Sequence, residues 1–169
     1  MALERRLDMK LVFDDEVCNS TKLVIEEYIP MKIVLDETEE PINYFSYSKE
    51  KKSLLEIAVG VQSGKIKKVT LLMSEDYTIY DKKICMANVL CESANIKVKD
   101  YITIECEKFS TELFEDALRI SLSDKNIKRY VKMDRLYIGL SNEDDIIEIC
   151  IMELSDEERK HIKNELEYQ

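Results

Sequence analysis

Two pairs of apolar runs, each pair separated by a short polar turn, form the clearest pattern in this chain. Residues 54–61 and 66–73 are rich in Ile, Val and Leu and flank the turn Gln-Ser-Gly-Lys. Residues 135–140 and 146–152 repeat the arrangement around Ser-Asn-Glu-Asp-Asp. Strand-forming runs joined by turns of this composition are typical of β-hairpins. The pattern therefore predicts two hairpins.

Shorter runs predict further strands around the hairpins. The β-branched segments 22–29 and 31–35 are separated by Pro30, whose missing N–H indicates a kink or a sheet edge. Alternating or apolar runs predict strands over residues 77–80, 96–99, 101–106 and 118–122. Residues 39–43 are expected to form a turn. The apolar run 84–91 fits either a buried strand or a helical turn, because its period does not separate the two.

Three segments carry helical signals. Residues 110–116 are expected to form a single helical turn. Residues 124–133 are expected to form a short helix, since apolar residues there stand at i, i+3 and i+4. Ser155 and Glu158 make an S-x-x-E capping box, which predicts a terminal helix to about residue 167.

These elements predict an α+β fold: a predominantly antiparallel β-sheet with hairpins, short helices and a C-terminal helix. No Pro-, Gly- or Ser-rich linker interrupts residues 1–169, so a single domain is expected. The two hairpins also echo one another, since Val-Gly-Val at 59–61 and Ile-Gly-Leu at 138–140 each precede a polar turn. The echo suggests a two-hairpin pseudo-repeat over about 45–80 and 118–153.

Charge narrows the range of partners. Lys and Arg number 25 and Asp and Glu 35, which gives a net charge of −10. Such a chain repels phosphate backbones and anionic lipids, so neither nucleic acid nor a membrane is an expected partner. Two acidic runs are candidates for contacting a basic protein: Asp36, Glu37, Glu39, Glu40, Glu143, Asp144 and Asp145. The acidic segments 14–16 and 142–145 lack the alternating acids and central Gly of an EF-hand, so we expect no metal there.

Cysteine and histidine content predicts neither a disulfide framework nor a catalytic centre. Five cysteines are an odd number without CxxC spacing, which favours reduced core residues in the cytoplasm. No signal peptide and no run of about 18 apolar residues is visible, which favours the same compartment. His161 is the sole histidine and is expected on the exposed face of the polar terminal helix. We predict no cofactor, no metal ligand and no catalytic residue.

The turn after Gly60 invites comparison with a phosphate-binding P-loop. A P-loop has four residues between its glycines and a Ser or Thr after its Lys. Here three residues separate Gly60 from Gly64, and Ile66 follows Lys65. The segment also joins two predicted strands, whereas a P-loop opens a helix. We interpret it as a hairpin turn.

The order of elements, the hairpin over 55–71 and the second hairpin resemble the small acidic immunity proteins that bacteria keep in the cytoplasm to neutralise a cognate toxin. The resemblance covers residues 50–169 at most and has no diagnostic motif, so no site residue is transferred from it. It implies a non-enzymatic protein whose acids dock on a basic toxin and speed the encounter. Two alternatives stay open: an enzyme or small-ligand-binding protein with a site of scattered residues, and a homo-oligomeric structural subunit.

Overall fold

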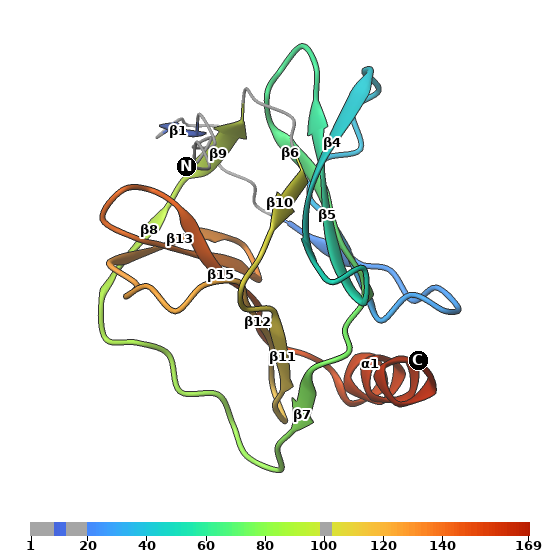
Figure 1. Ribbon diagram of the computed structural model, residues 1–169. Helices are drawn as coiled ribbons and strands as arrows, with labels where there is room; N and C mark the ends of the chain where they lie inside the picture. The colour runs from blue at the N-terminus through green and yellow to red at the C-terminus, as the bar shows by residue number, and fades with distance from the viewer. Residues whose placement is uncertain (1–8, 13–19, 99–102) are drawn as a thin grey trace.

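The computed structural model describes residues 9–12, 20–98 and 103–169, which form two large β-sheets, a two-stranded ribbon and a helix (Figure 1). The six-stranded sheet has the order β10 (Thr103–Glu105), β4 (Ile42–Lys49), β5 (Ser53–Gly60), β6 (Ile66–Met73), β3 (Met31–Val34) and β2 (Lys22–Leu23). The seven-stranded sheet has the order β7 (Tyr77–Ile79), β11 (Ser110–Leu113), β12 (Leu118–Ser121), β15 (Ile146–Ile151), β14 (Leu136–Leu140), β13 (Arg129–Met133) and β8 (Leu90–Ser93). The ribbon pairs β1 (Met9–Val12) with β9 (Asn95–Val98). The helix is α1 (Asp156–Tyr168).

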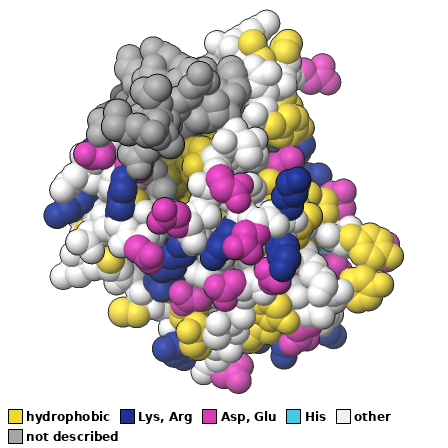
Figure 2. Space-filling model, in the orientation of Figure 1, with side chains coloured by type: hydrophobic (Ala, Val, Ile, Leu, Met, Phe, Trp, Pro, Cys, Tyr) yellow, Lys and Arg dark blue, Asp and Glu magenta, His cyan; other side chains and the backbone are white. Residues whose placement is uncertain are grey.

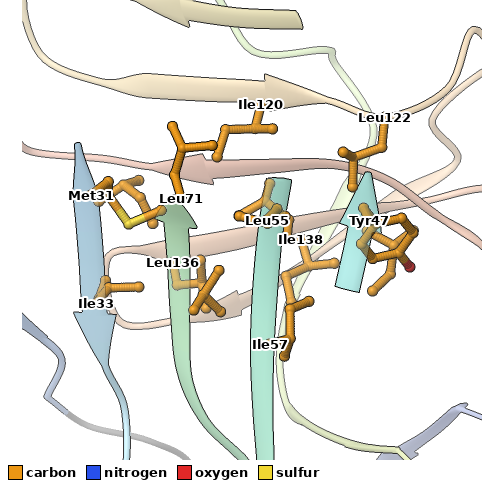
Figure 3. Close-up of a cluster of buried hydrophobic side chains, with 14 of the residues drawn as sticks. Met31, Ile33, Tyr47, Leu55, Ile57, Leu71, Ile120, Leu122, Leu136 and Ile138 are labelled. Atoms are coloured by element: carbon orange, nitrogen blue, oxygen red, sulfur yellow. The ribbon is translucent and has the colours of Figure 1, made fainter. Parts of the chain in front are cut away.

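The two large sheets pack against each other, and the hydrophobic core lies between them (Figure 3). Because side chains alternate along a strand, each sheet turns one set of residues inward. The core residues labelled in Figure 3 come from both sheets: Met31, Ile33, Tyr47, Leu55, Ile57, Leu71, Ile120, Leu122, Leu136 and Ile138. Burying each Leu or Ile of this kind stabilises the fold by about 1.5–3 kcal/mol. The sandwich is therefore held mainly by a core that both sheets share.

Both predicted hairpins are confirmed, and they belong to opposite sheets. β5 pairs antiparallel with β6 in one sheet, and β14 pairs antiparallel with β15 in the other. The turn after Gly60 joins strand to strand, and Gly64 within it has a φ of 68°, a value that favours glycine. The strands predicted near residues 77, 96, 103 and 118 are present as β7, β9, β10 and β12. Residues 99–102 of those predictions lie outside the described residues.

The predicted terminal helix is also confirmed, together with its cap. Ser155 and Glu158 exchange both hydrogen bonds of the capping box, at 2.9 and 3.2 Å. Ile162 is buried and attaches the helix to the core. His161, expected to be exposed, is instead half-buried, because the loop before β3 lies against it and Ile29 O accepts a hydrogen bond from its Nε2–H at 3.0 Å.

Most strand pairs are antiparallel as expected, but both large sheets are mixed. β10 runs parallel to β4, β7 to β11, and β8 to β13. The helices predicted at 110–116 and 124–133 are wrong, since β11 and β13 occupy these segments. Each gains strand partners from elsewhere in the chain, and this pairing overrides the local helical pattern. Among the described residues, α1 is the one α-helix.

Three further sequence predictions need correction. The turn predicted at 39–43 ends early, because β4 begins at Ile42, and this strand was not predicted. The strand predicted at 22–29 shrinks to the two residues of β2, since the chain turns at Tyr28, where φ is 66°. The run 84–91 is neither a buried strand nor a helical turn: it is largely irregular, and Leu90 is 60% exposed.

Residues 80–89, here called the strap, join β7 and β8 at opposite edges of the seven-stranded sheet (Figure 1). Six inter-strand spacings of about 4.8 Å amount to roughly 29 Å. The eleven Cα steps between the end of β7 and the start of β8 reach at most about 36–40 Å, so the strap is largely extended. It is fastened by Arg119, which donates to Cys85 O at 2.8 Å, and by Ile84 N, which donates to Asp116 Oδ1 at 2.9 Å.

Candidate functional site

The first predicted acidic run lies in the loop before β4, and Lys67 of β6 holds this loop in place. Lys67 Nζ lies 2.8 Å from Asp36 Oδ2 and 2.7 Å from Glu40 Oε1, and it donates to Thr38 O at 3.3 Å. The Lys67 side chain is only 4% exposed. It stands at a β-bulge, where β6 has one residue more than β5 between paired positions. We call Lys67, Asp36 and Glu40 the Lys67 triad; its two carboxylates share one lysine of this chain.

Glu40 also fastens the loop to the β5–β6 turn. Its Oε2 accepts hydrogen bonds from Gln62 N at 2.9 Å and Ser63 N at 3.0 Å, and its Oε1 accepts one from Ser63 Oγ at 2.6 Å. A Cβ atom at Gly60 would lie 2.1 Å from Glu40 Oε1, so this carboxylate position requires glycine there. The loop and the turn therefore form one interlocked rim at the end of the six-stranded sheet.

The pKa values of the Lys67 triad follow from these contacts. Burial acts to raise the pKa of Asp36, but hydrogen bonds from Lys67 and Thr38 lower it to about 2. Hydrogen bonds from Lys67 and Ser63 lower the pKa of Glu40 to about 2. Burial acts to lower the pKa of Lys67, yet its two carboxylate partners raise it overall. All three groups are therefore charged at neutral pH, and the ion pairs persist there.

Three exposed apolar side chains lie beside this rim. Ile42 is 41% exposed, Tyr44 is 49% exposed and Val61 is 46% exposed. Val61 N donates to Pro41 O at 2.9 Å, and Ile42 pairs with Gly60, so the turn adjoins the start of β4. Ile42 and Tyr44 point to the same outer face because they are two residues apart on one strand. We call Ile42, Tyr44 and Val61 the β4 patch.

Charged groups flank the β4 patch. Glu37 and Glu39, the remaining acids of the first run, are exposed on the loop that precedes β4. Lys68 Nζ lies 5.6 Å from the centroid of the Tyr44 ring, a cation–π arrangement. The surface near the rim therefore combines exposed apolar area with two outward carboxylates and one lysine.

The second predicted acidic run forms the β14–β15 turn, in the other sheet. Its acids form ion pairs with cationic side chains of this chain. Asp145 Oδ2 lies 2.7 Å from Lys125 Nζ, and Glu143 Oε2 lies 4.0 Å from the same atom. Asp144 is paired with Arg129. Figure 2 likewise shows Lys and Arg side chains interspersed with Asp and Glu across the displayed face. Asp36 and Glu40 thus share one lysine, and Glu143 and Asp145 share another. The two runs belong to different sheets. Their role in docking to a partner stays a prediction.

Another cluster of polar side chains is buried on the outer face of the seven-stranded sheet. Tyr130 Oη donates to Glu148 Oε1 at 2.6 Å, and Cys150 Sγ donates to the same oxygen at 3.2 Å. Arg119 Nε lies 3.7 Å from Glu148 Oε2. We call these four residues the Glu148 cluster. The Glu148 side chain is only 8% exposed, and Arg119 beside it also donates to Cys85 O of the strap.

The chemistry of the Glu148 cluster does not favour a nucleophile. Burial and the charge of Glu148 raise the pKa of Cys150, and burial and the hydrogen bond to Glu148 raise the pKa of Tyr130. A reactive cysteine needs the opposite shift, because the thiolate is the reacting form. Among the residues the structure describes, no three His, Cys, Asp or Glu side chains are grouped so as to hold a metal ion. We interpret the cluster as a structural polar network, in which Arg119 Nε is buried beside Glu148 without a hydrogen-bond partner of its own.

The prediction that the cysteines are core residues is right for only part of the set. Cys106 and Cys150 are buried, but Cys85 and Cys91 are exposed. Cys85 lies on the strap and Cys91 on the edge strand β8, so neither faces the space between the sheets. Cys18 lies outside the described residues.

No known protein family matches the sequence, and no curated protein is detectably similar to it. Within the described ranges, no helix is both long enough and apolar enough to cross a bilayer. Function is therefore inferred from the geometry of the surface.

Sequence reasoning missed Lys67 as the residue that holds the loop before β4, and Val61 as part of the β4 patch. A signal for Lys67 was present, because two consecutive lysines, Lys67 and Lys68, interrupt the alternation of an apolar strand, as a β-bulge does. Val61 gave no such signal, since its sequence places it at the end of a predicted strand and only the turn geometry exposes it.

Proposed function

We propose that this protein acts by binding another protein, with the β4 patch at the centre of the contact. The observation that carries the proposal is that three exposed apolar side chains adjoin a rim fixed by the Lys67 triad. Aromatic and apolar anchors supply much of the energy of protein interfaces. Holding them in place beforehand reduces the entropy lost on association. A role of this kind needs no catalytic residue.

The chemistry of the partner follows from the charges at the rim. Exposed Glu37 and Glu39 favour a partner that surrounds an apolar contact with basic residues. Within this class, we propose the role that the resemblance to immunity proteins implies: binding a basic toxin and blocking its activity. Attraction between the rim and such a toxin would raise the association rate more than the lifetime of the complex.

The direct test mixes the purified protein with a toxin encoded next to its gene and measures toxin activity. We expect inhibition at a 1:1 ratio, and we expect Ile42→Ser combined with Tyr44→Ala to weaken binding by roughly a hundredfold, as loss of an interface hot spot does. Leu90→Ser is the matched control, because it removes an exposed apolar side chain from β8 and should leave inhibition unchanged. Full toxin activity at stoichiometric excess would refute the immunity role.

A second measurement separates binding from inhibition. Glu37→Gln with Glu39→Gln should slow association several-fold at low salt, with dissociation little changed, and the effect should fade as salt screens the charges. Binding without inhibition would retain a protein-binding role and reject the immunity role. No binding at all would reject both.

A further inference from the structure

A second exposed aromatic surface is formed by the loop before β3 and the end of α1. Tyr28 is 64% exposed and Tyr168 is 75% exposed. Their ring centroids are 6.0 Å apart, and the ring planes are inclined at 47°. Figure 2 shows hydrophobic side chains projecting at the right, where Figure 1 places this loop and the end of α1. We call Tyr28 and Tyr168 the tyrosine pair.

The backbone that presents the tyrosine pair is tied to the rest of the molecule. Ile29, which follows Tyr28, accepts a hydrogen bond from His161 Nε2 at 3.0 Å. Gln169, which follows Tyr168, accepts one from Ser74 N at 2.9 Å through its side chain. Tyr28 itself has a φ of 66°, a region that bulky residues rarely occupy. A bulky ring is thus kept exposed at a position where glycine would be the favoured residue.

The chain places its own cations on other rings, but not on these two. Three tyrosine rings each have a lysine ammonium nearby: Lys68 on Tyr44 at 5.6 Å, Lys82 on Tyr80 at 4.8 Å and Lys132 on Tyr137 at 5.5 Å. In the part of the chain that the structure describes, no Lys or Arg lies over Tyr28 or Tyr168, whose ring contact is with each other. The rings of Tyr28 and Tyr168 therefore keep faces open to an outside group.

The charges near the tyrosine pair favour a cation. Glu27 adjoins Tyr28 and is exposed, and Glu165 stands one helical turn before Tyr168. The last turn of α1 has no basic residue, so the negative end of the helix dipole is not compensated there by the helix itself. A positively charged group from a partner would meet favourable potential at this end of α1.

We propose that the tyrosine pair binds the guanidinium group of an arginine side chain on a partner protein. A guanidinium is planar and weakly hydrated, so it stacks on aromatic faces more readily than the ammonium group of lysine. Two inclined rings offer two faces to one such group, and the neighbouring carboxylates supply the opposite charge. This surface is built from elements other than the β4 patch, so the proposal stands independently of the function proposed above.

A peptide of alternating Gly and Arg, titrated into the whole chain at about 0.15 M salt, tests the proposal. The ring signals of isotope-labelled tyrosines, followed by NMR, should shift at Tyr28 and Tyr168. A peptide with citrulline, the neutral isostere of Arg, should bind at least about tenfold more weakly, because it lacks the cation.

Variants of the chain make the result specific. Tyr28→Gly removes a ring and suits the positive φ, so the fold should be retained, as circular dichroism can check. We expect Tyr28→Gly and Tyr168→Ala each to weaken Arg-peptide binding by roughly tenfold, and Tyr44→Ala to leave it unchanged. Equal binding of the citrulline peptide, unchanged binding by Tyr28→Gly, or loss of binding only in Tyr44→Ala would overturn the proposal. Self-association that Tyr28→Gly abolishes in sedimentation would assign the rings to a contact between copies and would also overturn it.

Discussion

The two sheets of the sandwich share a core but differ in their outer faces. On the seven-stranded sheet, Glu148 and Cys150 point outward and are nevertheless buried, with the strap fastened across that side. On the six-stranded sheet, the outward residues Ile42 and Tyr44 remain exposed, and Glu56 is half-buried. The same alternation of side chains thus produces a polar interior on one sheet and an accessible surface on the other.

The difference shows which hydrogen bonds a polar side chain needs when it is shielded from water. A carboxylate shielded from water needs hydrogen-bond donors from the protein, and Glu148 has them in Tyr130 and Cys150. On an uncovered face, water forms hydrogen bonds with the polar groups. Clustered apolar side chains that are exposed there do not stabilise the fold. The β4 patch is therefore better explained by contact with a partner than by the stability of the fold.

The largest expected effect is at the covered face. Glu148→Ala should lower the free energy of unfolding by about 3 kcal/mol, because it leaves the buried Tyr130 hydroxyl without its acceptor and takes an ion-pair partner from Arg119. Urea unfolding followed by circular dichroism measures this. The matched change on the other sheet, Glu56→Ala, should cost no more than about 0.5 kcal/mol. Equal losses in the two variants would contradict the contrast between the faces.

A smaller loss is expected at the rim. Lys67→Met should destabilise the fold by about 2 kcal/mol, less than for a fully buried ion pair, because Asp36 can turn toward water. Hydrogen exchange should accelerate at the amides of the loop before β4. Lys68→Met, at the next residue, is the control and should cost less than about 1 kcal/mol. Unchanged exchange in the loop would show that Lys67 does not order it.

Lowering the pH should remove the stabilisation by the Lys67 triad without a mutation. Asp36 and Glu40 have pKa values lowered to about 2 in the folded protein, below their ordinary values of 3.8 and 4.5. Their stabilisation is therefore complete above about pH 4.5 and is lost as the pH falls toward 2. The stability difference between wild type and Lys67→Met should narrow over this interval, as urea unfolding at a series of pH values can test. A constant difference would contradict the assignment.

The smallest effect on stability is expected within the β4 patch. Tyr44→Ala should change the free energy of unfolding by only about 0.5 kcal/mol, the size of an exposed cation–π contact. Tyr47→Ala, three residues along the same strand but facing the core, should cost about 3 kcal/mol or more. A large loss for Tyr44→Ala would make this residue part of the stable core and remove the main reason to regard it as a contact.

The elements that the sequence predicts correctly are those whose signals are local. The β5–β6 and β14–β15 hairpins have apolar strands close to their turns, and α1 begins at a capping box made by Ser155 and Glu158. The failures arise where a segment depends on distant partners. β11 pairs with β7 and β12, and β13 with β8 and β14, so short runs that look helical alone become strands.

The candidate site was predictable to a similar degree. The acids of the loop before β4 stand out in the sequence, but nothing local shows that Asp36 and Glu40 turn inward to Lys67 while Glu37 stays outside. That partition depends on a β-bulge and on the approach of the β5–β6 turn, which only the folded chain brings together. The tyrosine pair is harder still to foresee, because its two rings are 140 residues apart in the chain.

The path of the strap has a consequence for the order in which the protein assembles. β7 and β8 are the outermost strands of their sheet, yet both are synthesised before every strand that lies between them. β7 and β8 can pair only after β11 and β13 have been made. The strap that connects them can pack against the sheet only after the intervening strands have joined. Pairing between distant segments of this kind slows folding. The last step of maturation should therefore be the closing of this side of the sandwich, when Cys85 O of the strap meets the side chain of Arg119.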